Sequence, residues 1–195
     1  MKILTKIFSL WLIALTLLGS CKQSVLKERI RTHTGLVGTN WLHEPLQAID
    51  RLDLLHQIFG EVTTTHEVVK ELYATTKLER LMGLKPLPKW LKVTFTDSTK
   101  MQNLRNTYTL GLGELSCLSL SLGTTHTLLL DDLKATKIAW QLGIKTKSTL
   151  HVLSQAKAIG IISAVKPEIL KLEQIGQIAQ PDLVEAILWS VGERL

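Results

Sequence analysis

Short apolar runs that alternate with amphipathic stretches are the feature that most constrains the fold of this chain. Residues 127–130 form a compact apolar run that ends in Asp131 and Asp132, and a helical pattern follows over residues 134–142. Strands that alternate with helices are typical of α/β proteins, because parallel strands need crossover connections between them. The sequence therefore predicts an α/β fold with a mostly parallel sheet.

The remaining elements follow from apolar spacing and capping signals. Apolar residues recur at helical intervals from Leu42 to Gly60, which predicts a helix that ends at this glycine. Thr64 followed by Glu67 is a capping box, which predicts the start of another helix. The other predicted strands are 36–37, 91–95 and 144–146, and the other predicted helices are 97–110, one from near Glu114, 148–158, 167–175 and 181–189.

The composition fits one packed domain with a moderate positive charge. The chain has 195 residues, of which 45% are hydrophobic, and a formal net charge of +6. Two cysteines exclude a disulfide framework and a cysteine-rich zinc site. Aromatic residues make up only 5%, so a stacking platform for single-stranded nucleic acid is not expected to be the main theme.

Residues 1–21 resemble the leader of a bacterial lipoprotein. Lys2 and Lys6 accompany an apolar run over residues 7–18, which is shorter than the roughly 20 residues that a membrane-spanning helix needs. The small residues before Cys21 resemble a lipobox, in which the cysteine is diacylated and becomes the mature N-terminus. A wrongly chosen start or a chance apolar leader is the alternative. The predicted division is a leader (1–21), a linker (22–35) and a folded domain (36–195).

Acidic residues offer the most informative candidate chemistry. Asp131 and Asp132 follow a predicted strand, and ligand sites in open parallel sheets lie beyond the carboxyl ends of strands. Glu114 starts a helix after a glycine turn, and Glu71 lies in an otherwise apolar helical stretch. Carboxylates that converge from separate elements would bind Mg²⁺ or Mn²⁺ through oxygen. Each acid alone also has a structural interpretation: Glu114 as a first-turn acid, Asp132 as an N-cap and Glu71 on a solvated face.

Other reactive residue types give no site. The six histidines show no metal-ligand spacing, and the glycines at 111 and 113 form a turn rather than a dinucleotide-binding loop. Cys117 lies in an apolar helical stretch, which predicts a buried and unreactive thiol.

An ordered set of motifs resembles an uncharacterised PIN-like family, from about Gly38 to Glu193. The matching segments are 51–55, 59–62, 67–72, 111–115, 129–132 and 149–162. The resemblance implies a three-layer PIN-like fold, with a short, mostly parallel sheet flanked by helices. It also implies nuclease ancestry, in which acids hold a divalent metal ion against the scissile phosphate of RNA.

Carried over position by position, the resemblance gives the acids roles. It implies Glu71, Glu114, Asp131 and Asp132 as catalytic residues, with Glu71, Glu114 and Asp132 as metal ligands. The implied cofactor is Mg²⁺ or Mn²⁺ and the implied reaction is endonucleolytic hydrolysis of RNA. Many relatives are toxins of toxin–antitoxin pairs, so an antitoxin protein and a second copy in a homodimer are further candidate partners.

One position departs from the family pattern. The family's first acid ends the first strand, and this chain has Gly38 there, followed by Thr39 and Asn40. Loss of one carboxylate should weaken metal binding, so a catalytically inactive PIN-like binding module is the alternative function. A lipid-anchored lipoprotein with a non-enzymatic role is a third hypothesis. The domain favours the cytoplasm and the leader favours the membrane, and the sequence does not reconcile the two.

Two groups of lysines flank the acidic residues in the sequence. One interpretation is that these lysines form an ordinary solvated surface. The other is that they contact RNA phosphates, in which case the binding affinity falls steeply as the salt concentration rises. A nuclease-like fold favours RNA as the partner. The groups are Lys85, Lys89, Lys92 and Lys100, and Lys134, Lys137, Lys145 and Lys147.

The predicted lipidation can be tested on protein from the native host. We expect the mature chain to begin at Cys21, to carry the mass of acyl chains and to fractionate with membranes. Mass spectrometry of the N-terminus measures this directly, with Cys21→Ala as the matched control. An unmodified Met1, or a soluble protein with a free Cys21 thiol, would contradict the lipoprotein hypothesis.

Overall fold

The computed structural model describes residues 36–38, 45–75, 87–177 and 181–194. The predicted leader and linker lie outside these described residues, as do Thr39, Asn40 and Lys85.

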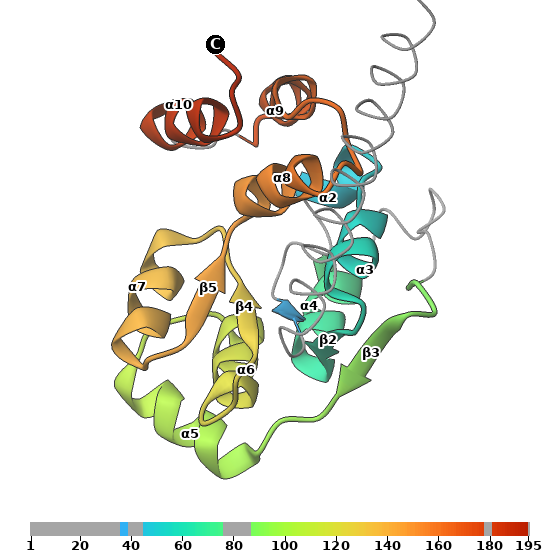
Figure 1. Ribbon diagram of the computed structural model, residues 1–195. Helices are drawn as coiled ribbons and strands as arrows, with labels where there is room; N and C mark the ends of the chain where they lie inside the picture. The colour runs from blue at the N-terminus through green and yellow to red at the C-terminus, as the bar shows by residue number, and fades with distance from the viewer. Residues whose placement is uncertain (1–35, 39–44, 76–86, 178–180, 195) are drawn as a thin grey trace, which may run out of the picture.

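A five-stranded sheet forms the centre of the molecule (Figure 1). Its strand order is β3-β2-β1-β4-β5, and every pair of neighbouring strands is parallel. The predicted α/β class with a parallel sheet is therefore confirmed. The strands are β1 (Leu36–Gly38), β2 (Val62–Thr65), β3 (Leu91–Thr94), β4 (Thr127–Leu129) and β5 (Lys145–Lys147).

Helices pack against the sheet in two groups (Figure 1). Helix α6 packs across β1, β2 and β4 and is flanked by α4 and α5, while α3 packs against α8, which in turn contacts α10. The helices are α2 (Pro45–Ala48), α3 (Asp53–Phe59), α4 (His66–Thr75), α5 (Ser98–Thr107), α6 (Leu112–Ser121), α7 (Leu133–Gln141), α8 (Thr149–Ala158), α9 (Lys166–Gln174) and α10 (Pro181–Ser190).

The hydrophobic core runs through β4 and the helices on either side of it. Leu128 and Leu129 are fully buried, as strands covered on both faces require. Leu118 from α6 and Leu153 from α8 are also fully buried and belong to the same cluster. Burial of each such side chain contributes roughly 1.5–3 kcal/mol, so this shared cluster supplies much of the driving force for folding.

The helix predicted over residues 42–60 is wrong in its middle. Helix α2 ends at Ala48 and α3 begins only at Asp53. Asp50 between them has φ of +56°, a left-handed conformation that a continuous right-handed helix cannot contain. The helical spacing of apolar residues continues across this turn, because Ile49 is buried in the core like the helical residues around it. The pattern therefore did not indicate the break.

The capping box predicted at Thr64 and Glu67 is also wrong. Thr64 lies inside β2, a strand that the sequence pattern did not predict, and α4 begins at His66. Thr65 performs the capping instead, because its Oγ1 accepts a hydrogen bond from the backbone N–H of Val68 at 3.3 Å.

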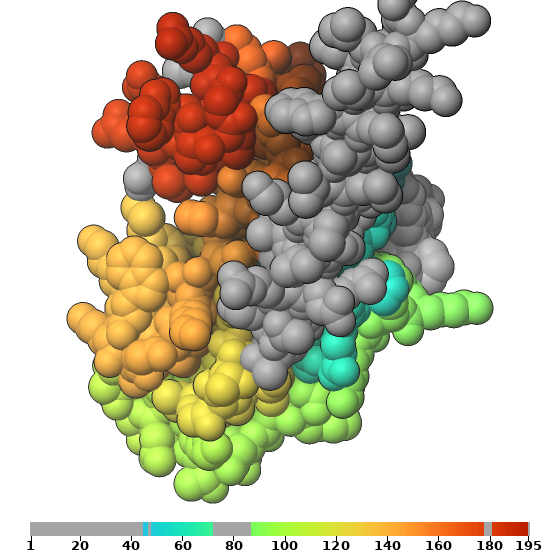
Figure 2. Space-filling model, in the orientation of Figure 1, coloured from blue at the N-terminus to red at the C-terminus, as the bar shows by residue number. Residues whose placement is uncertain are grey.

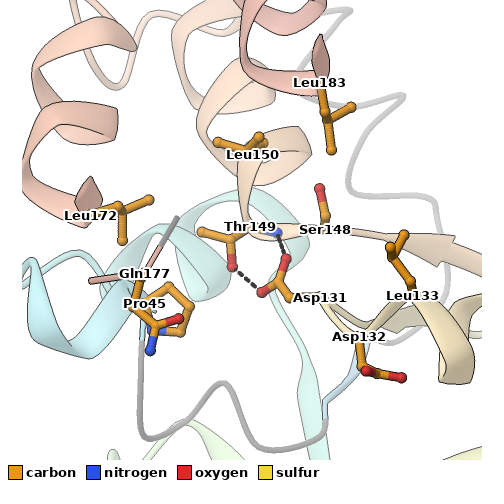
Figure 3. Close-up of a pocket in the computed structure, with 10 residues that line it drawn as sticks. All are labelled: Pro45, Asp131, Asp132, Leu133, Ser148, Thr149, Leu150, Leu172, Gln177 and Leu183. Carbon is orange, nitrogen blue, oxygen red and sulfur yellow. Dashed lines mark hydrogen bonds between the residues drawn. The ribbon is translucent and has the colours of Figure 1, made fainter. Parts of the chain in front are cut away.

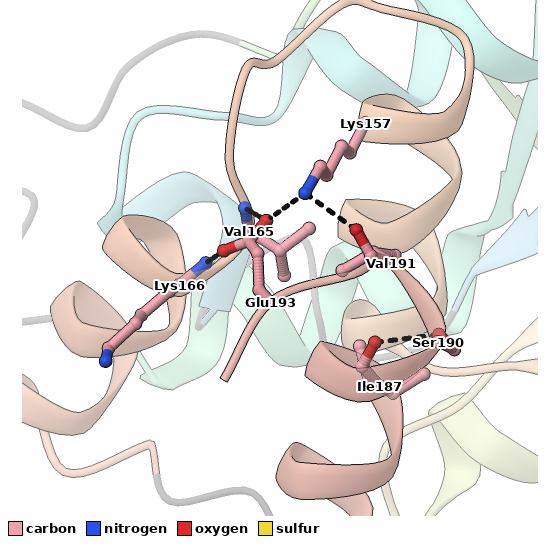
Figure 4. A network of polar contacts seen from close by, with 7 residues as sticks. All are labelled: Lys157, Val165, Lys166, Ile187, Ser190, Val191 and Glu193. Atoms are coloured by element: carbon pink, nitrogen blue, oxygen red, sulfur yellow. Dashed lines mark hydrogen bonds and ion pairs between the residues drawn. The ribbon is translucent and has the colours of Figure 1, made fainter. Parts of the chain in front are cut away.

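A polar network ties the end of the chain to α8 and α9 (Figure 4). The Glu193 carboxylate accepts hydrogen bonds from the backbone N–H groups of Val165 and Lys166, both at 2.8 Å, at the start of α9. Lys157 of α8 donates to Glu193 Oε1 at 2.6 Å and to the carbonyl oxygen of Val191 at 2.8 Å. One carboxylate thus caps α9 and pairs with a lysine from another helix.

A second ion pair fixes the start of α3 against α9. Arg51 donates from Nε at 3.1 Å and from Nη2 at 2.7 Å to Oε1 of Glu168, a buried residue. Lys171 donates to the other oxygen of Glu168 at 2.9 Å. The pKa of Glu168 lies below its usual value, because these partners outweigh the effect of burial, which would raise it.

Replacement of Glu193 by alanine should lower the free energy of unfolding at pH 7 by about 1–3 kcal/mol, since α9 loses its cap and Lys157 its partner. Burial would raise the pKa of Glu193, but the hydrogen bonds that it accepts hold this pKa below its usual value. Such a carboxylate stabilises the fold above its unfolded pKa and loses that contribution as the pH falls through the folded pKa.

Urea unfolding of the wild type and of Glu193→Ala at pH 7 and below about pH 4 measures this effect. The difference in free energy of unfolding between the wild type and Glu193→Ala should be smaller at the acidic pH. The control is Glu185→Ala, on the exposed face of α10, which should be as stable as the wild type. An equal difference at both pH values would contradict the assigned role.

Candidate functional site

The carboxyl edge of the sheet brings the ends of the central strands together. Gly38 ends β1 and lies between Thr64 of β2 and Leu129 of β4 in the parallel register. Asp131 and Asp132 follow β4 directly, so both acids lie at the edge where ligands bind in open α/β sheets. The structure therefore places Gly38 at the centre of this edge.

Glu71 reaches this region from α4 by contacting the glycine turn at the start of α6. The backbone N–H of Gly113 donates to Glu71 Oε1 at 2.9 Å. A Cβ atom on Gly113 would collide with the Glu71 carboxylate and would lie 3.2 Å from Val68 Cγ2. Glycine at 113 therefore allows the carboxylate to approach the backbone, and Glu71 is half-buried rather than on a solvated face.

Glu114 lies beside Glu71 in the first turn of α6. Its Oε2 accepts a hydrogen bond from the backbone N–H of Gly111, the N-cap residue of α6, at 3.0 Å. The pKa of Glu114 is raised, first by burial and then by the negative charges of Asp132 and Glu71. The hydrogen bond from Gly111 and the charge of Lys134 partly offset this increase.

The acids after β4 have different partners. Asp132 is the N-cap of α7, since its Oδ1 accepts from the backbone N–H of Ala135 at 2.7 Å. Asp131 accepts from the backbone N–H of Thr149 at 2.8 Å and from its hydroxyl at 2.6 Å. In Figure 3, Asp131 points toward Thr149 and Asp132 points away from it. Asp131 therefore fixes the start of α8, while Asp132 is the acid that interacts with Glu114.

Asp131 and its neighbours lie in a partly desolvated environment. Burial raises the pKa of Asp131, although the two hydrogen bonds from Thr149 work in the opposite direction. Burial also lowers the pKa of His151, and the nearby charge of Lys147 lowers it further. His151 Nδ1 lies 2.7 Å from the hydroxyl of Ser148, so this histidine belongs to the capping box of α8.

A cavity of about 370 Å³ opens next to Asp131 and Asp132 (Figure 3). Its polar side comprises these two acids with Ser148 and Thr149, and its apolar side comes from α7, α8, α9 and α10. The apolar lining includes Leu133, Leu150, Leu172 and Leu183. The carboxyl edge thus has both a polar rim and room for part of a ligand.

Two hydroxyl groups that sequence reasoning missed support the glycine turn. Thr65 Oγ1 at the end of β2 lies 2.6 Å from Ser116 Oγ, and Ser116 Oγ donates to the carbonyl oxygen of Gly113 at 2.7 Å. Prediction of β2 from its threonine-rich sequence would have been the signal that pointed to Thr65. Cys117 beside them is buried, as expected, and desolvation raises the pKa of its thiol to about 12.

The chemistry of the acids fits a hard divalent cation, although they do not form a complete metal site. Among the residues that the structure describes, no three histidine, cysteine or acidic side chains lie close enough together to hold a metal ion. The donors are nonetheless all carboxylates, the ligand type that hard divalent cations prefer. Burial is the main cause of the raised pKa of Glu114, and the negative charges of Asp132 and Glu71 raise it further. Glu67, one turn before Glu71, has a buried Oε2 with no hydrogen-bond partner among the described residues.

The described lysines differ in how available they are. Lys89, Lys92 and Lys100 are exposed around β3 and the start of α5, and Lys137 and Lys145 are exposed on α7 and β5. Two others are held by the protein. Lys134 donates to the carbonyl oxygen of Thr109 at 2.6 Å, and half-buried Lys147 donates to Gln155 at 2.7 Å.

Comparison with known proteins identifies the family. A search of curated proteins finds no match to this chain, and none of the described helices is both long and apolar enough to cross a membrane. A family model described as a PIN domain matches residues 42–193, which is more than half of the chain. PIN domains have a three-layer α/β/α fold, generally bind nucleic acids and generally use divalent metal ions. This match shows that the chain belongs to the PIN-domain family, and the parallel α/β sheet agrees with it.

Proposed function

We propose that this protein acts on RNA, with Glu71, Glu114 and Asp132 forming an acidic site for Mg²⁺ or Mn²⁺. The observation that carries the proposal is that these acids come from three separate elements and interact electrostatically. Glu71 comes from α4, Glu114 from α6 and Asp132 from the start of α7, and the two other charges raise the pKa of Glu114. Such a group of carboxylates at the carboxyl edge supports a hydrolytic role in a nuclease-like fold.

The three carboxylates would provide the cation with oxygen ligands, and waters would complete its coordination. When bound, the ion supplies Lewis-acid stabilisation of the phosphodiester and lowers the pKa of a coordinated water. The protein's own contribution is positioning: Gly113 fixes one oxygen of Glu71, Gly111 fixes one oxygen of Glu114, and Ala135 fixes one oxygen of Asp132.

A second candidate function is RNA binding without cleavage. Gly38 ends the central strand at the position where the family resemblance places the first acid. In addition, each of the three acids already accepts a backbone hydrogen bond. A site with fewer carboxylates binds a divalent cation more weakly. Weak metal binding would prevent cleavage and leave RNA binding as the function. Membership of a toxin–antitoxin pair is implied by the family resemblance alone.

Glu114→Gln should remove the metal site without removing the helix cap, because a glutamine still accepts the N–H of Gly111. We expect Mn²⁺ affinity to fall by at least about tenfold and RNA cleavage to be lost. Conversely, Gly38→Asp restores a carboxylate at the carboxyl edge and should raise Mn²⁺ affinity by about tenfold. Isothermal titration with Mn²⁺ and cleavage of a labelled single-stranded RNA measure both effects.

The control is Glu173→Gln, which removes an exposed charge from α9 and should leave both properties unchanged. Equal Mn²⁺ affinity and cleavage in Glu114→Gln and the wild type would contradict the proposed site. RNA binding by a wild type that does not cleave, together with cleavage by Gly38→Asp, would favour the second candidate function.

Asp132 tests whether the acids interact as proposed, independently of any metal ion. Asp132→Asn keeps the cap of α7 and should preserve stability, whereas Asp132→Ala should lower the free energy of unfolding by about 1 kcal/mol. Removal of the Asp132 charge should also lower the pKa of Glu114 toward its usual value. NMR titration of the Glu114 carboxyl carbon measures that pKa, and an unchanged value in Asp132→Asn would show that the two acids do not interact.

A further inference from the structure

Trp140 near the end of α7 is a large aromatic side chain held in place on the surface. The residue is 63% exposed, and its indole N–H donates to Thr146 Oγ1 of β5 at 2.7 Å. The only polar atom of the ring is therefore already bonded within the protein. What Trp140 presents to solvent is apolar ring surface, fixed in orientation by a neighbouring strand.

The surroundings of Trp140 are strongly basic. Residues 133–167 contain six lysines and no aspartate or glutamate. Lys137 lies one helical turn before Trp140 on the same face of α7, and Lys145 of β5 lines the same surface depression as Trp140. Both lysines are exposed and make no ion pair with the described residues.

The sheet edge beside the indole is hollowed. An open depression of about 620 Å³ is lined by Trp140, by β5 and by Thr127, Gly143 and Ile144. In Figure 2, α7 lies on the outer side of the molecule. In the part of the chain that the structure describes, β5 is the last strand of the sheet, so no described strand covers this depression.

A comparison within the chain shows that exposure alone does not define this feature. Trp189 on α10 is 78% exposed, but no hydrogen bond holds its indole to the described residues. Its helix carries Asp182 and Glu185, and Glu185 lies one turn before Trp189 on the same face. A polyanion is therefore attracted to Trp140 and repelled from Trp189.

We propose that Trp140 is a stacking site for one unpaired base of RNA, with Lys137 and Lys145 contacting the flanking phosphates. Aromatic stacking tolerates every base, because each base has a π-face, and lysines supply the attraction to the backbone. The low aromatic content of the chain argues against a row of stacking sites, but a single site needs only one indole ring. The inference rests on the proposed action on RNA and locates a contact outside the acidic residues. Eight residues of helix place Trp140 about 12 Å along α7 from Asp132, so one short strand can reach both.

The test is binding of a labelled single-stranded oligouridine of about twelve nucleotides to the full-length chain, in EDTA so that cleavage plays no part. Fluorescence anisotropy should show that Trp140→Ala raises Kd roughly tenfold, while Trp140→Phe stays within about twofold of the wild type. Trp189→Ala is the matched control and should bind like the wild type. Lys137→Ala should reduce the slope of log K against log salt by about one, and Trp140→Ala should leave that slope unchanged.

Thermal unfolding of each variant separates loss of the stacking site from loss of the fold. A folded Trp140→Ala that binds the RNA like the wild type would overturn this inference and leave the proposed action on RNA intact. An equal loss in Trp189→Ala would overturn it as well. Absence of RNA binding by the wild type would overturn both proposals. Self-association that depends on Trp140 and not on RNA would show a protein interface instead.

Discussion

The close approach of α4 to the start of α6 is the contact on which the candidate site depends. Glu71 bonds to the backbone of Gly113 and occupies space that any side chain at 113 would fill. The same turn positions Glu114, whose carboxylate bonds back to Gly111. Ser116 and Thr65 continue this polar arrangement to the end of β2. Two acids that are 43 positions apart in the sequence are thereby held beside each other by one glycine turn.

Helix capping and site chemistry use the same atoms in this protein. Glu114 and Asp132 each hold the first turn of a helix with one oxygen, and this leaves the other oxygen of each carboxylate outside that bond. Their structural and functional interpretations are therefore compatible, because a carboxylate accepts several hydrogen bonds and still carries its charge. Asp131 differs, since both of its oxygens bond to Thr149.

Much of the fold could be predicted from the sequence, because most elements have strong local signals. The predicted strand that is β4 lies in an apolar run, and the helix predicted over 97–110 corresponds to α5, which Asp97 caps. The strand β2 was missed, since three of its four residues are threonine and its burial comes from neighbouring strands.

The acids of the site were named from the sequence, but their partners were not. The bonds from Gly113 to Glu71 and from Thr149 to Asp131 join residues that are 42 and 18 positions apart. Local patterns contain no information about such pairings, which only the packed fold creates. The pairing of Trp140 with Thr146 was missed for the same reason, although these residues are close in sequence. This hydrogen bond depends on how the turn between α7 and β5 orients the helix against the strand.

The two outer strands share a property that bears on solubility rather than on recognition. Both carry lysines, Lys92 on β3 and Lys145 and Lys147 on β5, and both are at most four residues long. A short, charged outer strand is a poor template for pairing with the strand of another molecule, because pairing would bring lysine ammonium groups of like charge close together. The lysines on these strands therefore disfavour edge-to-edge pairing of the sheet that the described residues form.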